Sequence, residues 1–502
     1  MNVLLVNPPF MGRYSRTSRS PAVPIGGTLY YPFWLAYAAG CLDEDGATVD
    51  IIDAPAEGYS VADVLGRAEE TPPHLIVVDT STASIYSDVG VAERLKERFP
   101  SSFVTLVGTH PSALPEETLS LSDSVDAVAR GEYDYTIRDL ARCLDGGGDL
   151  HDVEGLTFRE NGTVCANQAR PLIEDVDALP FVTEVYRRHL DIRNYFFAAV
   201  DYPMVQVITG RGCPYKCFFC LYPQTFHSRR FRPRSVANVV DEFQYIVEYL
   251  PEVRQVEIDD DTFTVDKGRV REICRELLNR GIDLKWYAQV RADLDLETML
   301  IMKEAGCRGL GVGFESGDQG CLNLMKKGIR VEQIRDFVSS TEKAGLLVHG
   351  CFIFGNPGET RETMERTLTL AKELNCSTMQ FYPLQVYPGT EAYKWAVENG
   401  YLMARDYSSW LAEDGGYHCF LNLPGLPAAE IEAFCQRAIR EYYLRPRYIA
   451  KKAGEMLRRP GEIRKTMLSS KTFFARLLTG RNGAVPAESE CGGQREGMFE
   501  LR

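Results

Sequence analysis

Short apolar runs alternate with amphipathic stretches over the first 150 residues of the chain. Helical periodicity falls near residues 33–45, 61–70 and 89–99. The runs that predict strands lie at 3–6, 48–52, 75–78, 103–107 and 127–129. Strands that alternate with helices are typical of a doubly wound parallel α/β sheet, whose ligands bind at the carboxyl ends of the strands. We therefore expect a ligand-binding α/β domain over residues 1–150.

A linker with one hairpin is predicted over residues 151–200. Asn161 and Gly162 stand between two strand-like segments, and Asn-Gly is the preferred two-residue hairpin turn. Pro171 and Pro180 follow, and the residue before a proline favours extended backbone. This segment therefore predicts a hairpin and then a crossing to a second domain.

A second alternating series begins at Met204. Strands are expected at 204–209, 255–258, 285–289, 309–314, 347–353 and 377–384. Helices are expected at 236–249, 267–280, 295–305, 331–344 and 360–374. About six βα units are fewer than the eight of a closed barrel. Residues 201–400 therefore predict a partial (β/α)6 barrel, with functional residues at the carboxyl ends of its strands.

The alternation stops near residue 400. We expect a mostly helical region over 401–480 and a disordered tail over 481–502. Residues 440–481 hold twelve Lys or Arg and three Asp or Glu, a local charge of +9 (12 − 3). The simpler interpretation is a solvated basic face over an acidic barrel. The alternative is weak peripheral contact with an anionic membrane, to which each basic residue contributes about 1 kcal/mol.

Composition narrows the functional classes. The 502 residues are 45% hydrophobic and 25% charged, with a net charge of −14, which excludes wholesale disorder and disfavours non-specific nucleic-acid binding. Fourteen cysteines without a signal-peptide pattern indicate a reducing cytoplasm. Residues 20–42 carry no charge but are rich in proline and glycine, so we expect a loop and a buried helix rather than a membrane span.

Only three of the cysteines cluster. Cys213, Cys217 and Cys220 directly follow the first strand of the second series. Three thiolates can hold an iron–sulfur cluster and leave one iron open to a small molecule. A structural zinc site is the alternative, but tetrahedral zinc needs a fourth ligand, which His227 could supply. We favour the iron–sulfur cluster.

The CxxxCxxC spacing at the end of the first strand of a partial barrel resembles the radical SAM superfamily. The resemblance implies a [4Fe–4S] cluster that binds S-adenosyl-L-methionine (SAM) and cleaves it reductively to a 5′-deoxyadenosyl radical. Segment 257–264 resembles the one that receives the SAM amino group, and segment 350–360 resembles the glycine motif near adenine and ribose. The SAM-binding residues that this resemblance implies are Phe219, Glu257, Asp260, Gln289, Arg291, Glu315, Ser316 and Gly355.

A doubly wound sheet ahead of such a barrel resembles the cobalamin-dependent branch of the superfamily, over about residues 1–450. The DxHxxG signature of histidine-ligated cobalamin is absent after the first strand, where Asn7-Pro8-Pro9 stands instead. Histidine ligation of cobalt is therefore not expected there. His110 lies at a strand end and could approach the corrin, although an ordinary loop histidine is the simpler interpretation. The expected cobalamin contacts are Thr80, Ser81, Thr82, Gly108, Thr109, His110, Gly131 and Glu132.

The resemblance also limits the types of reaction that the protein is expected to catalyse. The commonest chemistry in this branch is methylation of an unactivated carbon, here of a small-molecule or lipid-type metabolite, with an external electron donor of flavodoxin or ferredoxin type. One alternative is a non-methylating relative that closes rings in bacteriochlorophyll or modifies hopanoids. A cobalamin-binding sensor is a second alternative, but a sensor needs no reductive cluster. The substrate and the residues that contact it are not evident from the sequence.

Overall fold

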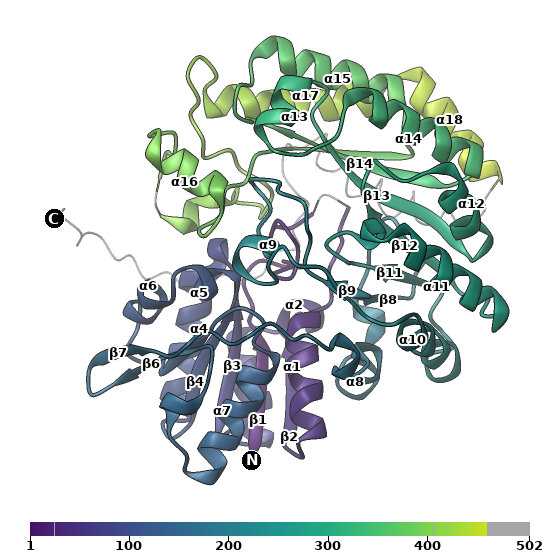
Figure 1. The fold of residues 1–502 in the computed structure, drawn as a ribbon. Helices are drawn as coiled ribbons and strands as arrows, with labels where there is room; N and C mark the ends of the chain where they lie inside the picture. Colours follow the sequence, from purple (N-terminus) through teal and green to yellow (C-terminus); the bar gives the residue numbers. More distant parts are fainter. Residues whose placement is uncertain (25, 405, 459–502) are drawn as a thin grey trace.

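The protein has two large β-sheets, and the residues expected to contact the cofactors lie at the ends of their strands (Figure 1). The computed structural model describes residues 1–24, 26–404 and 406–458. The first sheet has the strand order β2-β1-β3-β4-β5-β6-β7. Its strands are β1 (Asn2–Asn7), β2 (Thr48–Asp53), β3 (Leu75–Thr80), β4 (Phe103–Gly108), β5 (Ala127–Ala129), β6 (Leu156–Glu160) and β7 (Thr163–Ala166). Strands β1 to β5 are parallel, as the alternating pattern predicts.

The predicted hairpin forms, but it belongs to the first sheet. Strand β6 pairs antiparallel with β5, and β7 pairs antiparallel with β6. The sheet is therefore mixed at this edge. Asn161 and Gly162 both have positive φ at the turn, of 50° and 77°, which is the geometry for which Asn-Gly is selected.

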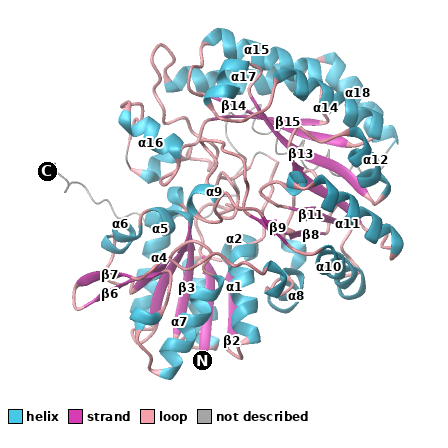
Figure 2. Cartoon of the chain, viewed as in Figure 1, coloured by secondary structure: helices cyan, strands magenta, loops and turns pink. Residues whose placement is uncertain are grey.

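Helices flank both sheets, and the loops after their strands converge around the short helix α9 (Tyr222–Thr225) (Figure 2). The helices of the first domain are α1 (Phe33–Glu44), α2 (Ala54–Glu57), α3 (Val61–Glu70), α4 (Ile85–Arg98), α5 (Thr109–Ala113), α6 (Pro115–Ser120) and α7 (Asp134–Gly146). Every side chain of α1 from Phe33 to Leu42 is buried, because the helix packs against the sheet, α7 and α8 (Val182–His189). The uncharged stretch is thus a core helix, as predicted.

The second sheet is parallel and has six strands in the order β15-β14-β13-β12-β11-β8. These are β8 (Met204–Val207), β11 (Gln255–Ile258), β12 (Lys285–Val290), β13 (Cys307–Glu315), β14 (Leu347–Phe354) and β15 (Thr378–Pro383). The connecting helices are α10 (Val236–Tyr249), α11 (Lys267–Asn279), α12 (Leu296–Glu304), α13 (Gln319–Leu324), α14 (Val331–Ala344) and α15 (Arg361–Leu374). The predicted partial (β/α)6 barrel is confirmed.

The C-terminal region is helical from Ala428 onward, as expected, and mostly irregular over 406–427. Helix α16 (Glu391–Glu398) precedes it, and α17 (Ala428–Tyr443) packs on β15 before α18 (Pro446–Arg458). Two residues of the basic stretch are used within the protein: Arg445 donates to the carbonyl of Lys372, and Lys451 donates to that of Asn375. Residues 459–481 of this stretch and the predicted tail at 481–502 lie outside the described residues.

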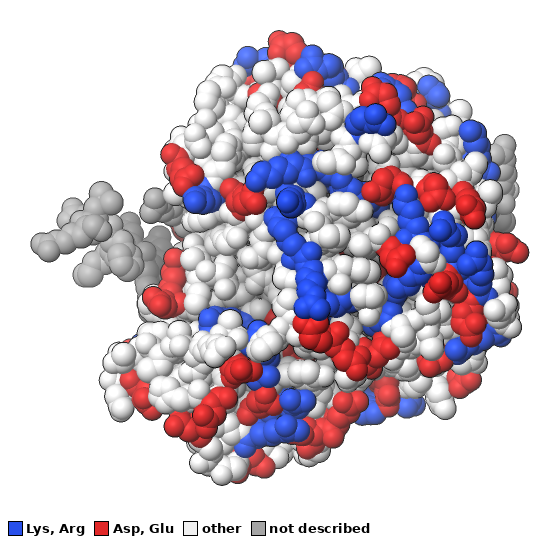
Figure 3. Space-filling model, viewed as in Figure 1, with Lys and Arg blue, Asp and Glu red and all other residues white. Residues whose placement is uncertain are grey.

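Figure 3 shows acidic and basic side chains interspersed over both domains. A run of Lys and Arg lies near the boundary between the two domains. Among the residues that the structure describes, there is no helix long and apolar enough to cross a bilayer.

Candidate functional site

The three clustered cysteines lie on a loop closed by a short antiparallel ribbon. Its strands are β9 (Gly210–Arg211) and β10 (Arg232–Pro233). Cys213 and Cys217 are buried and Cys220 is half-buried, and all three are free thiols. Gly212, with φ of 84°, leads into the loop. A Cβ on Gly212 would lie 2.2 Å from the carbonyl oxygen of Arg230, so the turn needs glycine.

The loop fits a cluster held by three thiolates. Burial raises the pKa of Cys213 and Cys220, and the charges of Asp261 and of the neighbouring thiols raise it further. These thiols would therefore stay protonated without a bound cation. A soft metal, such as the iron of a cluster, would bind them as thiolates and displace their protons.

His227 was the candidate for a fourth zinc ligand. Its Nδ1 lies 3.2 Å from Asp261 Oδ2. Its ring packs edge-on against Trp34 and Phe226 and tilted against Tyr222. Nδ1 of His227 is therefore paired with a carboxylate, while its buried Nε2 has no partner among the described residues.

The carboxyl end of β11 carries a run of carboxylates with different surroundings. Glu257 accepts from Gln206 Nε2 at 2.7 Å and from Gln289 Nε2 at 3.0 Å. Burial and the nearby Asp259 raise the pKa of Glu257 well above its usual range. Asp260 accepts from the backbone nitrogen and hydroxyl of Thr209, at 2.5 and 2.6 Å. Among the expected SAM contacts, Glu257 and Gln289 are thus brought together, whereas the carboxylate of Asp260 is directed at Thr209, two residues after the end of β8.

A second set of charged side chains lies at the carboxyl ends of β12 and β13. Glu315 has φ of 66°, which is strained for a residue with a side chain. Its Oε1 accepts from Lys327 Nζ at 2.7 Å, while its buried Oε2 has no partner in the described part of the chain. Arg291 donates to the carbonyl of Lys327, and its guanidinium stacks 3.9 Å from the Tyr215 ring centroid. Lys327 and Arg291 are therefore two cations at these strand ends, and Arg291 also lies 3.4 Å from Asp293 Oδ2. Such cations suit the carboxylate of a ligand.

The remaining expected SAM contacts, Ser316, Gly355 and Phe219, lie in different surroundings. The hydroxyl of Ser316 lies 3.3 Å from that of Thr367 and accepts from the backbone nitrogen of Asp318, so it stabilises a turn. Gly355, with φ of 88°, donates to Glu359 Oε2 at 2.6 Å. Phe219 is half-buried on the cysteine loop.

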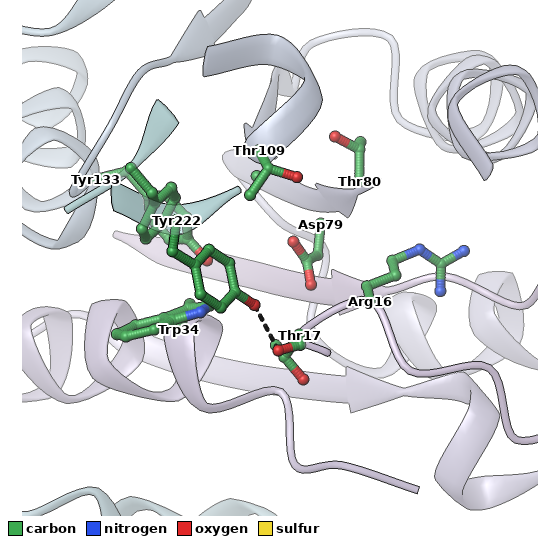
Figure 4. Close-up of a pocket in the computed structure, with 10 residues that line it drawn as sticks. Arg16, Thr17, Trp34, Asp79, Thr80, Thr109, Tyr133 and Tyr222 are labelled. Atoms are coloured by element: carbon green, nitrogen blue, oxygen red, sulfur yellow. Dashed lines mark hydrogen bonds between the residues drawn. The ribbon is translucent and has the colours of Figure 1, made fainter. Parts of the chain in front are cut away.

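The expected cobalamin contacts surround the ends of β3 and β4. A small pocket there is lined by Thr80, Gly108 and Thr109. In Figure 4, polar side chains that include Asp79 lie on one side and aromatic rings on the other. Gly108 has φ of 119°, and a Cβ there would lie 2.2 Å from the carbonyl oxygen of Thr80. The lining residues are Arg16, Thr17, Trp34, Asp79, Thr80, Gly108, Thr109, Tyr133, Tyr222 and Phe226.

This pocket joins the two halves of the site. Tyr222 and Phe226 closely follow Cys220 in the chain, and Tyr222 donates its hydroxyl proton to the carbonyl of Thr17. The wall of the pocket at the first sheet is therefore built partly by the cysteine loop of the second domain. Sequence analysis missed Arg16 and Tyr222, because the lining comes from segments far apart in the chain.

The other expected cobalamin contacts lie beside the pocket. Ser81 shares hydrogen bonds with the hydroxyls of Tyr14 and Ser84, both at 2.8 Å. Thr82 Oγ1 lies 3.3 Å from Nδ1 of His110. Burial lowers the pKa of His110 to about 4, and its Nε2 has no partner among the described residues.

Glu132 and Gly131 lie at the boundary with the second domain. Both oxygens of Glu132 accept from Arg232 on β10, one of them at 2.7 Å. Its carboxylate is thus engaged in joining the domains. Gly131, with φ of 67°, donates to the hydroxyl of Ser112 at 2.9 Å.

Family models match both halves of the chain. The radical SAM superfamily model matches residues 207–371, and the B12 binding domain model matches residues 26–141. These ranges contain the cysteine loop and most of the pocket, respectively.

Known proteins resemble the chain over most of its length. An uncharacterized methyltransferase of Pyrococcus horikoshii is 32% identical over 90% of this chain and 94% of the relative. An anaerobic magnesium-protoporphyrin IX monomethyl ester cyclase of Rubrivivax gelatinosus is 27% identical over 75% of this chain and 66% of the relative. A radical S-adenosylmethionine methyltransferase of Kitasatospora setae, solved with cobalamin and a [4Fe–4S] cluster, has a TM-score of 0.67 at 19% identity, covering 89% of both chains. The last similarity concerns the fold.

Proposed function

The chain belongs to the B12-binding radical SAM enzymes, and on this basis we propose that it methylates an unactivated carbon of a small-molecule or lipid-type metabolite. Its cofactors are a [4Fe–4S] cluster, SAM and cobalamin. The observation that carries the proposal is the shared pocket wall: residues that follow Cys220 line the strand ends of the B12-binding domain. A methyl carrier and a radical source on these two elements would face each other.

Three groups of residues would hold the cofactors. Cys213, Cys217 and Cys220 would ligate the cluster. Lys327 and Arg291 would offer cations to the SAM carboxylate, since charged partners make the stronger hydrogen bonds. Gly108 lines the pocket where the corrin ring would approach, and only glycine fits there, because a Cβ would lie 2.2 Å from the carbonyl oxygen of Thr80. When bound, these cofactors supply one-electron reduction of SAM and a transferable methyl group.

The residues around the cluster keep the site dry and fix its charges. Cys213 and Cys217 are buried, and Arg291 stacks on Tyr215, which lies between them in the chain. Glu257 is buried between two glutamines, and its raised pKa favours the neutral acid. A neutral Glu257 adds no further negative charge beside Asp259. Exclusion of water strengthens the electrostatic interactions that orient the ligands.

The electron donor is also part of the proposal. Lys216 is exposed between Cys213 and Cys217, where an acidic protein of flavodoxin or ferredoxin type would approach the cluster most closely. Charge complementarity of this kind mainly raises the association rate.

The test needs no knowledge of the substrate. Protein reconstituted anaerobically with iron, sulfide and cobalamin is incubated with reductant and with SAM labelled by three deuteriums in its methyl group. A methyltransferase transfers the label to protein-bound cobalamin and forms S-adenosylhomocysteine in equal amount, both measurable by mass spectrometry. Absence of label on cobalamin, with 5′-deoxyadenosine still formed, would contradict methylation.

A second candidate is oxidative ring formation without methylation. The similarity to the Rubrivivax cyclase favours it, at 27% identity over 75% of this chain. Incubation with magnesium-protoporphyrin IX monomethyl ester tests this candidate directly. A new ring in the product, without deuterium from SAM, would favour cyclisation over methylation.

A further inference from the structure

The carboxyl end of β11 forms a cradle of three buried acceptors. They are the carboxylate of Asp259 and the backbone carbonyls of Asp259 and Asp260. The cradle adjoins the cluster loop, because Cys213 Sγ lies 3.5 Å from the hydroxyl of Thr262 on the same segment. Carboxylate and carbonyl oxygens gathered in this way suit a cation.

Arg19 from the B12-binding domain occupies this cradle. Its Nη2 donates to the carbonyls of Asp259 at 2.8 Å and Asp260 at 2.6 Å, and its Nη1 bonds the Asp259 carboxylate. The side chain of Asp259 is 1% exposed, whereas that of Arg19 is 29% exposed. The side chain of Arg19 is therefore partly exposed, whereas its partner Asp259 is fully buried.

The two neighbouring carboxylates each have a further partner, and Asp261 also forms a longer ion pair with Arg19. Asp260 accepts both its hydrogen bonds from Thr209. Asp261 pairs with His227 at 3.2 Å, and Arg19 Nε is 4.0 Å away. Arg19 is thus the cation that directly balances Asp259. Another cation that bound the same three oxygens would have to displace it, because two positive charges at this spacing in a buried site repel strongly.

The backbone around Arg19 is fixed on both sides. The hydroxyl of Tyr222 donates to the carbonyl of Thr17, and that of Tyr417 donates to the carbonyl of Ser20 at 3.1 Å. These two hydrogen bonds hold the backbone on either side of Arg19.

We propose that Arg19 is a latch that fills the site of the SAM ammonium group and leaves it when SAM binds. The proposal rests on the proposed function, since it takes SAM as the ligand. SAM binds only while the latch is open. The apparent affinity for SAM is therefore the intrinsic affinity multiplied by the fraction of time for which the latch is open. It also makes the B12-binding domain respond to SAM, because Arg19 belongs to that domain and its partners belong to the barrel.

The test is equilibrium dialysis of iron-loaded protein under anaerobic conditions. Two ligands are compared: SAM, and 5′-methylthioadenosine, which lacks the amino-acid moiety. If the latch is open about a tenth of the time, Arg19→Gln binds SAM about tenfold more tightly than the wild type. Binding of 5′-methylthioadenosine is unchanged, because it places no cation in the cradle.

Two variants separate the latch from general effects. Arg19→Lys keeps a cation and binds SAM within about threefold of the wild type. Arg230→Gln removes an exposed arginine of the cysteine loop, which pairs with Glu174. This variant should leave SAM binding unchanged. Circular dichroism and iron content establish that each variant is folded and loaded.

Three results would overturn the latch. SAM binding by Arg19→Gln could be unchanged or weaker, which would make Arg19 neutral or part of the SAM site. Both ligands could tighten equally, which would place the effect outside the cradle. Failure of the wild type and the variant alike to bind SAM would overturn the proposed function together with the latch.

Discussion

Arg211 and Asp134 form a bidentate ion pair that ties the cluster loop to the B12-binding domain. The two nitrogen–oxygen distances are 2.7 and 3.0 Å, and the side chains are 0% and 4% exposed. Asp134 begins α7 in the first domain, and Arg211 lies two residues before the first cluster cysteine. The Arg211 guanidinium also lies over the rings of Trp34 and Tyr37. The relative position of the two domains thus depends on a contact beside the cluster.

We expect Arg211→Ala to destabilise the protein strongly. Loss of one partner leaves the Asp134 carboxylate buried without its cation, which costs about 3–5 kcal/mol. Denaturant unfolding of the protein measures the change. Arg230→Ala is the matched control, because its pair with Glu174 is exposed and such pairs contribute about 0–1 kcal/mol. Equal stability of the two variants would contradict the structural role of the Arg211–Asp134 pair.

We expect the buried carboxyl group of Glu359 to make the free energy of unfolding depend on pH. Burial raises the pKa of Glu359 to about 8 from an ordinary 4.5, so the folded protein binds this proton more tightly than the unfolded chain. The stability that this proton contributes is fully present below pH 4.5 and is lost as the pH rises to about 8. Each pH unit between these two pKa values corresponds to about 1.4 kcal/mol.

Glu359→Gln tests this dependence. The amide mimics the protonated acid and can still accept from the backbone nitrogens of Gly355 and Asn356. Between pH 5 and pH 8, we therefore expect the melting temperature of the variant to fall less than that of the wild type. Glu116→Gln, at an exposed position on α6, should leave the wild-type pH profile intact. Parallel profiles for Glu359→Gln and the wild type would refute the assignment.

Gly108→Ala should weaken cobalamin binding by at least about tenfold, or about 1.4 kcal/mol. The added methyl would lie 2.2 Å from the carbonyl oxygen of Thr80, at φ of 119°, so the pocket edge must shift. Cobalamin retained after desalting, measured by absorbance, gives the result. Gly90→Ala is the control, because its Cβ meets nothing within 4 Å on α4. Full retention of cobalamin by a folded Gly108→Ala protein would place the corrin elsewhere.

Lys216→Glu tests where the electron donor docks. Charge reversal at this exposed position should lower 5′-deoxyadenosine formation about tenfold when reduced flavodoxin is the donor at low salt, since complementary charge steers association. Formation driven by dithionite should not change. Lys343→Glu, an equal charge change on α14, serves as control. An equal loss with both donors would mean that Lys216 acts on the cluster rather than on docking.

The strand ends were predictable from the sequence because each follows a local apolar run. β3 reads Leu-Ile-Val-Val before its polar end, and the cysteines are recognisable by their spacing. Which side chain faces the site was harder to predict. Asp260 was an expected SAM contact, but its carboxylate faces Thr209 and that of its neighbour Asp259 faces Arg19. Successive residues at a strand end point in opposite directions, so the sequence does not tell which of two neighbouring carboxylates is directed at the site.

The long-range ion pairs left no signal in the sequence. Arg19 and Asp259 are 240 residues apart, and Arg232 and Glu132 are 100 apart. Periodicity reports only which face of an element is buried, so it gives no partner for an arginine in an irregular loop. The hairpin strands β6 and β7 show the same limit: the turn was evident, but the sheet that receives the hairpin depends on packing of β6 against β5.

Reductive cleavage of SAM by the reconstituted protein tests the central claim most directly. Anaerobic protein with about four irons per chain should form 5′-deoxyadenosine from SAM when dithionite is added, as measured by liquid chromatography and mass spectrometry. Cys213→Ala, Cys217→Ala and Cys220→Ala should each abolish this product, while Cys165→Ala, on the edge strand β7, should retain it. Undiminished 5′-deoxyadenosine from the Cys217→Ala protein would contradict the account.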